Sequence, residues 1–428
     1  MLAALDQANL FLVPLDDERR WYRYHQLFAD LLRVRSQDDD PAVERHRRAA
    51  GWYQDHGFAE DAFGHWLQAG AFAEAATLVE SQALAHLNQG QTAQVRAWIE
   101  RLPPDLVARR PWLLVFQAWG CLLSGKAMAV PACLRQAQQA ASEISGDDPE
   151  LAGHLAAIRA YLAALQGDVA TTIAQAQKAL AHLSPQSGSI RSVVSFVLGG
   201  MYLLTEDLVA ALAAFAEAAQ TGQAAGNHHV AVPAWCAVAS LRAVQGRLRQ
   251  AEVTYRTPLE LAMTAGGRPL PLAAQPYEGL AQLAYERNDL DAAGEWLDTS
   301  LELCRQGPNP ETTISTLLTQ ATLCRARGDP EAAAAALEDA LAVADGAQLD
   351  PLSESQLVAK RGELLLASGS VAAAARLIGA RHLTASHPAS YVREAEQIVL
   401  ARILLAQGQT REAQALLARL AAAAQNQD

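Results

Sequence analysis

The chain has 428 residues, a net charge of −12 at pH 7 and five cysteines, and aromatic residues make up only 6% of it. The acidic balance argues against nucleic-acid binding by this chain, because contacts to phosphate need clustered Lys and Arg. The odd cysteine count without a CxxC pair argues against a disulfide framework and a zinc site, and no apolar run approaches membrane-spanning length. We therefore expect a cytoplasmic, all-helical chain that binds no membrane and carries no cofactor or metal.

The first 37 residues differ in pattern from the rest of the chain. A helix is predicted over residues 2–9, and two strand-like segments joined by a charged turn follow over 10–25. An amphipathic helix is predicted over 26–35, with Leu27, Phe28, Leu31 and Leu32 on its inward side. A helix, a hairpin and a second helix are typical of the closing half of a winged-helix domain.

Two strings in this segment, ANLFLVPLD over residues 8–16 and WYRYHQLF over 21–28, resemble the winged-helix segment of the MalT-like transcription activators of bacteria. These activators are signal-transducing ATPases with a LuxR-type DNA-binding domain, and the segment links their nucleotide-binding module to a tetratricopeptide sensor. The string HRRAA over 46–50 resembles the start of that sensor. The resemblance implies the last part of a winged-helix segment over 1–37 and a tetratricopeptide superhelix over 38–428.

Two modules of that family find no counterpart in the sequence. The string GCLLSGKA over 120–127 has the spacing of a phosphate-binding loop, but Ala127 stands where a Ser or Thr would ligate magnesium. The string also falls at the end of a predicted helix over 112–123, whereas the motif requires a strand that feeds a loop. No helix-turn-helix pattern follows the repeats. We expect a fragment or shortened relative that lacks the ATPase and DNA-binding modules.

The stretch Ser195–Gln220 shows the pattern that the rest of the chain repeats. It predicts two antiparallel helices around a turn at Glu206. Small residues, Gly199 and Ala211, stand where the helices approach, and Phe215 fills the gap between them. The order Leu-Gly-x-x-Tyr, then Ala, Phe and Ala, resembles the tetratricopeptide repeat. Such a pair cannot bury its apolar faces alone, so neighbouring pairs must stack on it.

Residues suited to tight turns recur along the chain, with steps of 39 to 42 residues from Gly125 onward. These turn residues are Gly57, Gly90, Gly125, Gly167, Glu206, Gly246, Asn288, Gly328, Gly369 and Gly408. An alanine stands five positions after many of them: Ala62, Ala211, Ala251, Ala293, Ala333, Ala374 and Ala413. The register predicts one continuous right-handed α-solenoid of about ten helix pairs.

In such arrays the first helix of each pair lines the concave side, where a ligand would bind. Alignment of the pairs on their turn residues predicts a binding set of Trp112, Trp119, His154, Tyr161, Phe196, Gln275, Glu278, Gln282 and Tyr285. Aromatic faces beside amides and carboxylates suit a neutral polar ligand such as an oligosaccharide. The alternative for each aromatic residue is packing between repeats, which is the more frequent role of an aromatic side chain on a helix.

No catalytic constellation emerges from the sequence, so we expect no enzyme. Two classes of function remain. In the first, the chain is the sensor region of a MalT-like regulator, binds a small-molecule inducer or a regulatory protein, and signals to an ATPase module. In the second, it is a stand-alone tetratricopeptide scaffold that binds a peptide or protein partner. The wing-like N-terminus favours the first class, because a pure scaffold has no use for a truncated hairpin domain.

Overall fold

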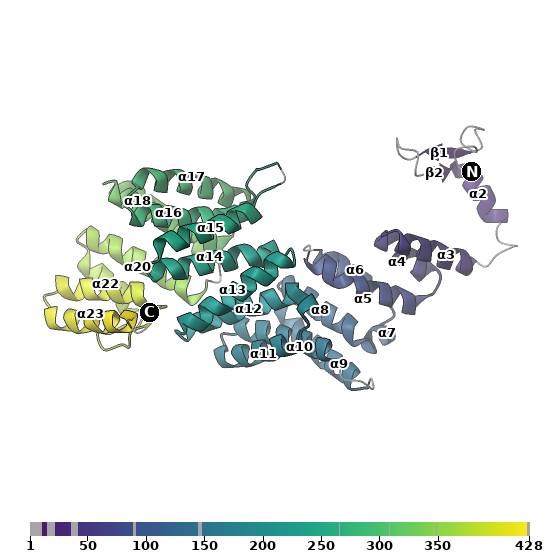
Figure 1. Ribbon diagram of the computed structural model, residues 1–428, viewed down its shortest axis with the longest axis horizontal. Helices are drawn as coiled ribbons and strands as arrows, with labels where there is room; N and C mark the ends of the chain where they lie inside the picture. Colours follow the sequence, from purple (N-terminus) through teal and green to yellow (C-terminus); the bar gives the residue numbers. More distant parts are fainter. Residues whose placement is uncertain are drawn as a thin grey trace. The chain divides into compact units, whose positions relative to one another are not determined.

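The computed structural model describes residues 11–14, 22–35, 42–88, 91–143, 148–264, 266–307, 309–347 and 349–425. Contacts divide the chain into two compact units, residues 1–146 and 147–428. No composition break in the sequence marks this division, and the array predicted over 38–428 runs across it. Each unit is built from antiparallel helix pairs (Figure 1).

The first unit contains three helix pairs among its described residues. They are α3 (Ala42–Asp55) with α4 (Ala59–Gln68), α5 (Phe72–Asn88) with α6 (Thr92–Glu100), and α8 (Pro111–Leu123) with α9 (Val130–Glu143). The short helix α7 (Pro104–Ala108) precedes α8, and the 3-10 turn η1 (Ala127–Ala129) precedes α9. Gly120 lies inside α8, so the string with phosphate-loop spacing is a helix end, as predicted.

The second unit contains seven pairs in its described part. They are α10 (Pro149–Leu165) with α11 (Val169–His182), α12 (Gly188–Leu204) with α13 (Leu208–Ala224), α14 (His228–Val244) with α15 (Leu248–Leu261), α16 (Ala274–Glu286) with α17 (Leu290–Gln306), α18 (Pro310–Ala326) with α19 (Pro330–Ala344), α20 (Pro351–Ala367) with α21 (Val371–Gly379), and α22 (Glu394–Ala406) with α23 (Thr410–Gln425). The 3-10 turns η2 (Pro185–Ser187) and η3 (Pro271–Ala273) precede α12 and α16. The all-helical repeat fold is therefore confirmed.

The predicted turn residues adopt the left-handed backbone that ends a helix. Nine of the ten have positive φ, from +59° at Asn288 to +82° at Gly57, while Gly90 lies outside the described residues. Glu206 (φ +63°) and Asn288 are the two without the freedom of glycine. The aspartates that follow four of these turns cap the next helix: Asp168, Asp207, Asp289 and Asp329 each accept a backbone N–H three residues on, at 2.9–3.1 Å. Each turn thus ends one helix and starts the next.

Alanine and glycine allow the two helices of a pair to approach closely. All seven alanines predicted at the close-packing point are fully buried. In the α12–α13 pair, a Cβ atom on Gly199 would lie 2.8 Å from the ring of Phe215, so the aromatic ring occupies the space that the missing side chain leaves. The neighbouring Gly200 has open space around it. Packing, rather than turn geometry, therefore requires glycine at 199.

The N-terminal segment forms the predicted hairpin and helix. Strands β1 (Leu12–Pro14) and β2 (Tyr22–Tyr24) pair antiparallel, with Leu12 opposite Tyr24, and α2 (Gln26–Arg35) follows. Phe28 of α2 stacks on Phe11 with ring centroids 4.9 Å apart. Of the four residues predicted to face inward, Phe28 and Leu32 are half-buried, whereas Leu27 and Leu31 are 76% and 50% exposed, so the prediction is wrong for Leu27 and Leu31. The helix predicted over 2–9 lies outside the described residues.

The connector of residues 380–393, between α21 and α22, contacts a turn that lies much earlier in the second unit. The backbone N–H of Tyr391 donates to Oε1 of Glu206 (3.1 Å), 185 positions earlier in the sequence. The Tyr391 side chain packs against the cluster of buried residues that holds Leu208 and Phe215. A hydrogen bond therefore joins the turn between α12 and α13 to the segment that precedes the last pair. We call residues 380–393 the closing connector.

Candidate functional site

A row of polar side chains runs along the first helices of five successive pairs in the second unit. Each lies six positions before the left-handed turn residue of its pair, as Ser240 lies before Gly246 and Gln282 before Asn288. The row consists of Ser240 (α14), Gln282 (α16), Thr322 (α18), Glu363 (α20) and Arg402 (α22). Equal offsets from the turn place these residues at the same height on equivalent helices, so they form one line across the stack.

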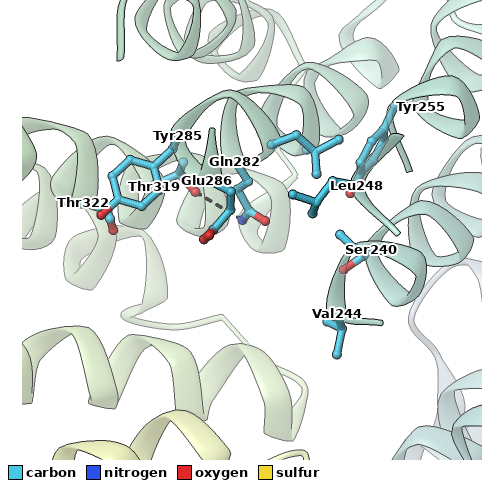
Figure 2. Close-up of a pocket in the computed structure, with 12 residues that line it drawn as sticks. Ser240, Val244, Leu248, Tyr255, Gln282, Tyr285, Glu286, Thr319 and Thr322 are labelled. Carbon is cyan, nitrogen blue, oxygen red and sulfur yellow. Dashed lines mark hydrogen bonds between the residues drawn. The ribbon is translucent and has the colours of Figure 1, made fainter. Parts of the chain in front are cut away.

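A cavity of about 460 Å³ opens at the first three members of this row. It is lined by residues of four helices: Ser240, Ala243 and Val244 of α14, Leu248 and Tyr255 of α15, Gly279, Gln282, Leu283, Tyr285 and Glu286 of α16, and Thr319 and Thr322 of α18. In Figure 2, Ser240 and Val244 lie on one side of the cavity, and Gln282, Glu286 and Tyr285 on the other. We call this the groove cavity.

A hydrogen-bonded network lies behind the groove cavity. Thr319 Oγ1 donates to Glu278 Oε1 at 2.8 Å, and Gln282 Nε2 donates to the same oxygen at 2.5 Å. Gln282 Nε2 also lies 3.3 Å from Thr319 Oγ1, a contact that Figure 2 shows. Burial raises the pKa of Glu278 above its usual value, and these hydrogen bonds only partly oppose that effect. The network fixes the Gln282 amide at the cavity wall.

Tyr255 reaches the groove cavity from the second helix of its pair because α16 carries a glycine at the crossing. A Cβ atom on Gly279 would overlap the Tyr255 ring. Tyr255 is 4% exposed, and its phenol shares a hydrogen bond with Ser240. Burial is the main cause that raises the pKa of this phenol well above its usual value, so Tyr255 remains a neutral hydroxyl.

The structure unites only part of the predicted binding set. Gln282 and Tyr285 line the groove cavity, and Glu278 lies directly behind it. Gln275, at the start of the same helix, is half-buried and does not line that cavity. The middle of the array therefore holds the predicted polar anchors together.

The other predicted aromatic residues serve mainly in packing. Trp119 is 3% exposed and sits in the core of α8, so it cannot be a stacking platform for a ligand. Phe196 is half-buried and meets the Phe215 ring edge-on at 5.4 Å. Trp112 and Tyr161 are half-buried, and the Trp112 ring lies 5.7 Å from that of Phe116. The ring contact of Phe196 thus lies within one helix pair, and that of Trp112 lies within one helix.

His154 is likewise a core residue, with 1% of its surface exposed. Burial lowers its pKa from 6.5 to about 4, although Glu150, whose Oε1 is 3.8 Å from Nε2, acts in the opposite direction. The ring is therefore neutral at pH 7 and enclosed by protein, which removes it from the binding set.

The predicted binding set omitted several polar residues of the groove cavity, among them Ser240, Tyr255, Thr319 and Thr322. Their side chains are short or buried, and their residue types alone do not mark them as binding residues. The offset from the turn residue would have found Ser240 and Thr322, because both stand six positions before a turn, as Gln282 does. Tyr255 comes from a second helix, which a search of first helices omits.

Stacked antiparallel helix pairs with glycine turns and a ligand-sized cavity on the first helices define a tetratricopeptide-type repeat protein. The family model of the MalT-like TPR region matches residues 153–428, and the model of the MalT winged helix domain matches residues 1–44. The chain therefore belongs to the MalT-like family, as its first 70 residues indicated.

The curated relatives include a MalT regulator, which agrees with this assignment. The serine/threonine-protein kinase PknK of Mycobacterium tuberculosis is 28% identical over 347 residues, which are 78% of this chain and 30% of PknK. The HTH-type transcriptional regulator MalT of Cronobacter sakazakii is 27% identical over 332 residues, which are 77% of this chain and 36% of MalT. The chain thus spans about a third of the length of these relatives.

Among solved structures, the quorum sensor NprR from B. thuringiensis in its apo form has a TM-score of 0.60 and 13% identity, covering 82% of this chain and 99% of its own. NprR in complex with its cognate peptide NprX has a TM-score of 0.54 and 12% identity, covering 77% and 97%. At these identities the likeness concerns the fold.

Proposed function

We propose that the chain is the ligand-sensing region of a MalT-like transcription regulator, and that its groove cavity binds a regulatory peptide or protein segment in an extended conformation. The observation that carries the proposal is the groove cavity itself, which opens onto an evenly spaced polar row along successive first helices. Binding there would bias the arrangement of the repeats and so signal to an ATPase module elsewhere in the regulator.

The spacing and chemistry of the row suit a peptide backbone. Packed helices lie about 10 Å apart, so an extended chain that rises about 3.3 Å per residue would meet a new row member roughly every three residues. The Gln282 amide both donates and accepts, and the hydroxyls of Ser240, Thr319 and Thr322 do the same. These are the partners that alternating backbone N–H and C=O groups need. The complex of the similarly folded NprR with a peptide supports this choice.

An oligosaccharide inducer is the second candidate, and one feature favours it. The half-buried ring of Tyr285 lines the same cavity as Gln282 and Glu286, which combines an aromatic face with hydrogen-bonding side chains. A volume of about 460 Å³ also lies within the range of about 300–1,000 Å³ usual for small-molecule sites.

We propose a role without catalysis and a cytoplasmic location, with no direct contact to DNA or membrane by this chain. Within the described part of the chain, one stretch, Pro185–Leu204, is long and apolar enough to span a membrane. That stretch includes α12, whose Gly199 accommodates Phe215 of α13, and this contact supports its role as a repeat helix.

The test uses the whole chain, a pool of random hexapeptides and a panel of oligosaccharides. Bound molecules are identified by affinity selection and mass spectrometry, and their affinities are measured by calorimetry. Gln282→Met should weaken binding of the selected molecules about tenfold, because it removes a hydrogen-bonding wall of the cavity. Gln306→Met is the matched control, since Gln306 also bonds the glutamate four positions earlier (3.2 Å) but lies exposed on α17. Equal affinities in the two variants would refute the site, and sugars retained in place of peptides would select the second candidate.

A further inference from the structure

The polar row continues beyond the groove cavity into a cluster of charged side chains on α18, α20 and α22. Glu363 Oε2 lies 2.9 Å from Nζ of Lys360 and 3.4 Å from Nη1 of Arg325, and Glu363 Oε1 lies 3.6 Å from Nη1 of Arg402. Three cations from three successive first helices thus surround one carboxylate. We call these four residues the cation cluster.

The charges of the cation cluster do not balance. Burial would raise the pKa of Glu363, but Lys360 foremost, then Arg325 and Arg402, outweigh burial and lower it. The carboxylate is therefore ionised and offsets one positive charge of three. The cluster retains an excess of two positive charges in a chain whose net charge is −12.

The placement of the cation cluster connects it with the groove cavity. Glu363 and Arg402 are members of the same row as Ser240, Gln282 and Thr322. Arg325 stands three positions before its turn residue Gly328, as Tyr285 of the groove cavity stands before Asn288. The side chains of Arg325 and Arg402 are 33% and 52% exposed, so solvent reaches both guanidinium groups.

Each guanidinium group has five N–H donors in a planar fork, and its contact with Glu363 uses Nη1. A carboxylate is the planar, bidentate acceptor that such forks match. A second carboxylate arriving from the groove would bring the cluster from an excess of two charges to an excess of one. The excess positive charge and the geometry of the donors therefore both favour a carboxylate as the ligand group.

We infer that the cation cluster is an anchor for a carboxylate of the peptide ligand, with Arg325 and Arg402 as its direct contacts and Glu363 as an anion that competes with the ligand for them. This inference rests on the proposed function, because the peptide would lie along the row between the groove cavity and α22. It adds the chemical class of the ligand: a peptide that carries a free C-terminal carboxylate or an acidic side chain.

The experiment compares hexapeptides selected from a random pool by the whole chain. Each selected peptide is made with a free C-terminal carboxylate, as the C-terminal amide, and as the amide with its acidic side chains replaced by amides. The expected result is a loss of about fivefold in affinity when the anchoring carboxylate is removed, with binding that weakens as salt rises. The first amide identifies a C-terminal anchor, and the second an acidic side chain.

Protein variants test the inference through the direction in which each one changes the affinity for the peptide. Arg402→Met should weaken the carboxylate form and leave the amide forms unchanged, whereas Glu363→Gln should strengthen the carboxylate form, because it removes the competing anion. Arg256→Met, at an arginine on α15 with a 70% exposed side chain, is the matched control and should change nothing. Thermal denaturation of each variant separates loss of binding from loss of folding.

Three other outcomes would overturn the inference. Equal binding of carboxylate and amide forms would refute the anchor and leave the groove proposal intact. Weaker binding of the carboxylate form by Glu363→Gln, with an unchanged melting temperature, would assign Glu363 itself to the ligand. No retained peptide at all would refute both the anchor and the proposed function.

Discussion

The α12–α13 pair and the closing connector hold the second unit together in different ways. The pair is stabilised by local packing, with Phe215 lying over Gly199 and alanines at the crossing. The connector follows α21, which has nine residues where α13 and α17 have 17, and it uses buried polar groups instead. Repeat stacks gain stability from nearest neighbours. The connector adds a contact between positions 206 and 391, and so couples pairs that are distant in the sequence.

The largest effect is expected at the centre of the connector's polar network. The fully buried Glu396 accepts from Arg381 Nε at 2.9 Å and from Arg393 Nη2 at 2.8 Å. Glu396→Ala should cost about 3–5 kcal/mol of unfolding free energy, because it leaves the partly exposed guanidinium group of Arg393 without this carboxylate and takes from Arg381 one of its two carboxylate partners, the other being Glu354. Glu302→Ala, at an exposed pair with Arg305, is the control and should leave the urea midpoint unchanged. Equal effects would show that the connector's ion pairs are as weak as surface pairs.

The stability of the folded protein should depend on pH because of His154, which lies on α10. Its pKa falls from 6.5 to about 4 on folding, so the folded state binds fewer protons than the unfolded state between these values. The stability is fully present above pH 6.5, and about 3 kcal/mol of it should be lost as pH falls through 4. His154→Gln should remove this part of the acid sensitivity, whereas His182→Gln, at an exposed position, should retain it. Parallel pH profiles for the two variants would contradict the prediction.

Substitutions at the neighbouring glycines Gly199 and Gly200 test the packing of α12 against α13. Gly199→Ala should cost about 1–3 kcal/mol, because the new Cβ atom would lie 2.8 Å from the Phe215 ring. Gly200→Ala, one position on and in open space, should stabilise the helix by up to about 1 kcal/mol. Thermal denaturation measures both, and equal shifts of the same sign would show that the helices can separate without cost.

The smallest effect on stability is expected at the contact between the turn at Glu206 and the closing connector. Glu206→Asn keeps a residue that tolerates positive φ but shortens the side chain that accepts from Tyr391, so it should cost about 1 kcal/mol. It should also hasten tryptic cleavage at Arg381 and Arg393. Asn288→Gly, at the other non-glycine turn, is the control and should leave cleavage unchanged. Unaltered proteolysis in Glu206→Asn would mean that the connector is held by its own polar network alone.

The sequence was sufficient to predict the pairs, because their determinants are local. A left-handed turn favours glycine or asparagine, although Glu206 also adopts one, and a close helix crossing favours alanine. Both kinds of residue recur at fixed intervals. The closing connector was not predictable in this way, since Gly369 and Gly408 are 39 residues apart, as regular pairs are. Spacing alone cannot distinguish a full second helix from a short one followed by an ordered loop.

The candidate site was predictable only in part, for a related reason. The register predicted Gln282 and Tyr285 correctly, but it also selected Trp119 and His154, which are buried. Whether an aromatic residue faces the groove or the next repeat depends on a rotation of one position along the helix. The distance from a turn does not remove this ambiguity, because Trp119 stands six positions before Gly125, as Gln282 stands before Asn288, and is buried.

The central claim, that a ligand binds at the groove cavity, is tested most directly by hydroxyl-radical footprinting with the tightest selected peptide. Tyr285 lines the cavity, and Trp296 is 37% exposed on α17 and stacks on Tyr277 away from it, so each reports on a different surface. Saturating peptide is expected to slow oxidation of Tyr285 and to leave oxidation of Trp296 unchanged. Protection of Trp296 with unchanged oxidation of Tyr285 would contradict the groove cavity as the binding site.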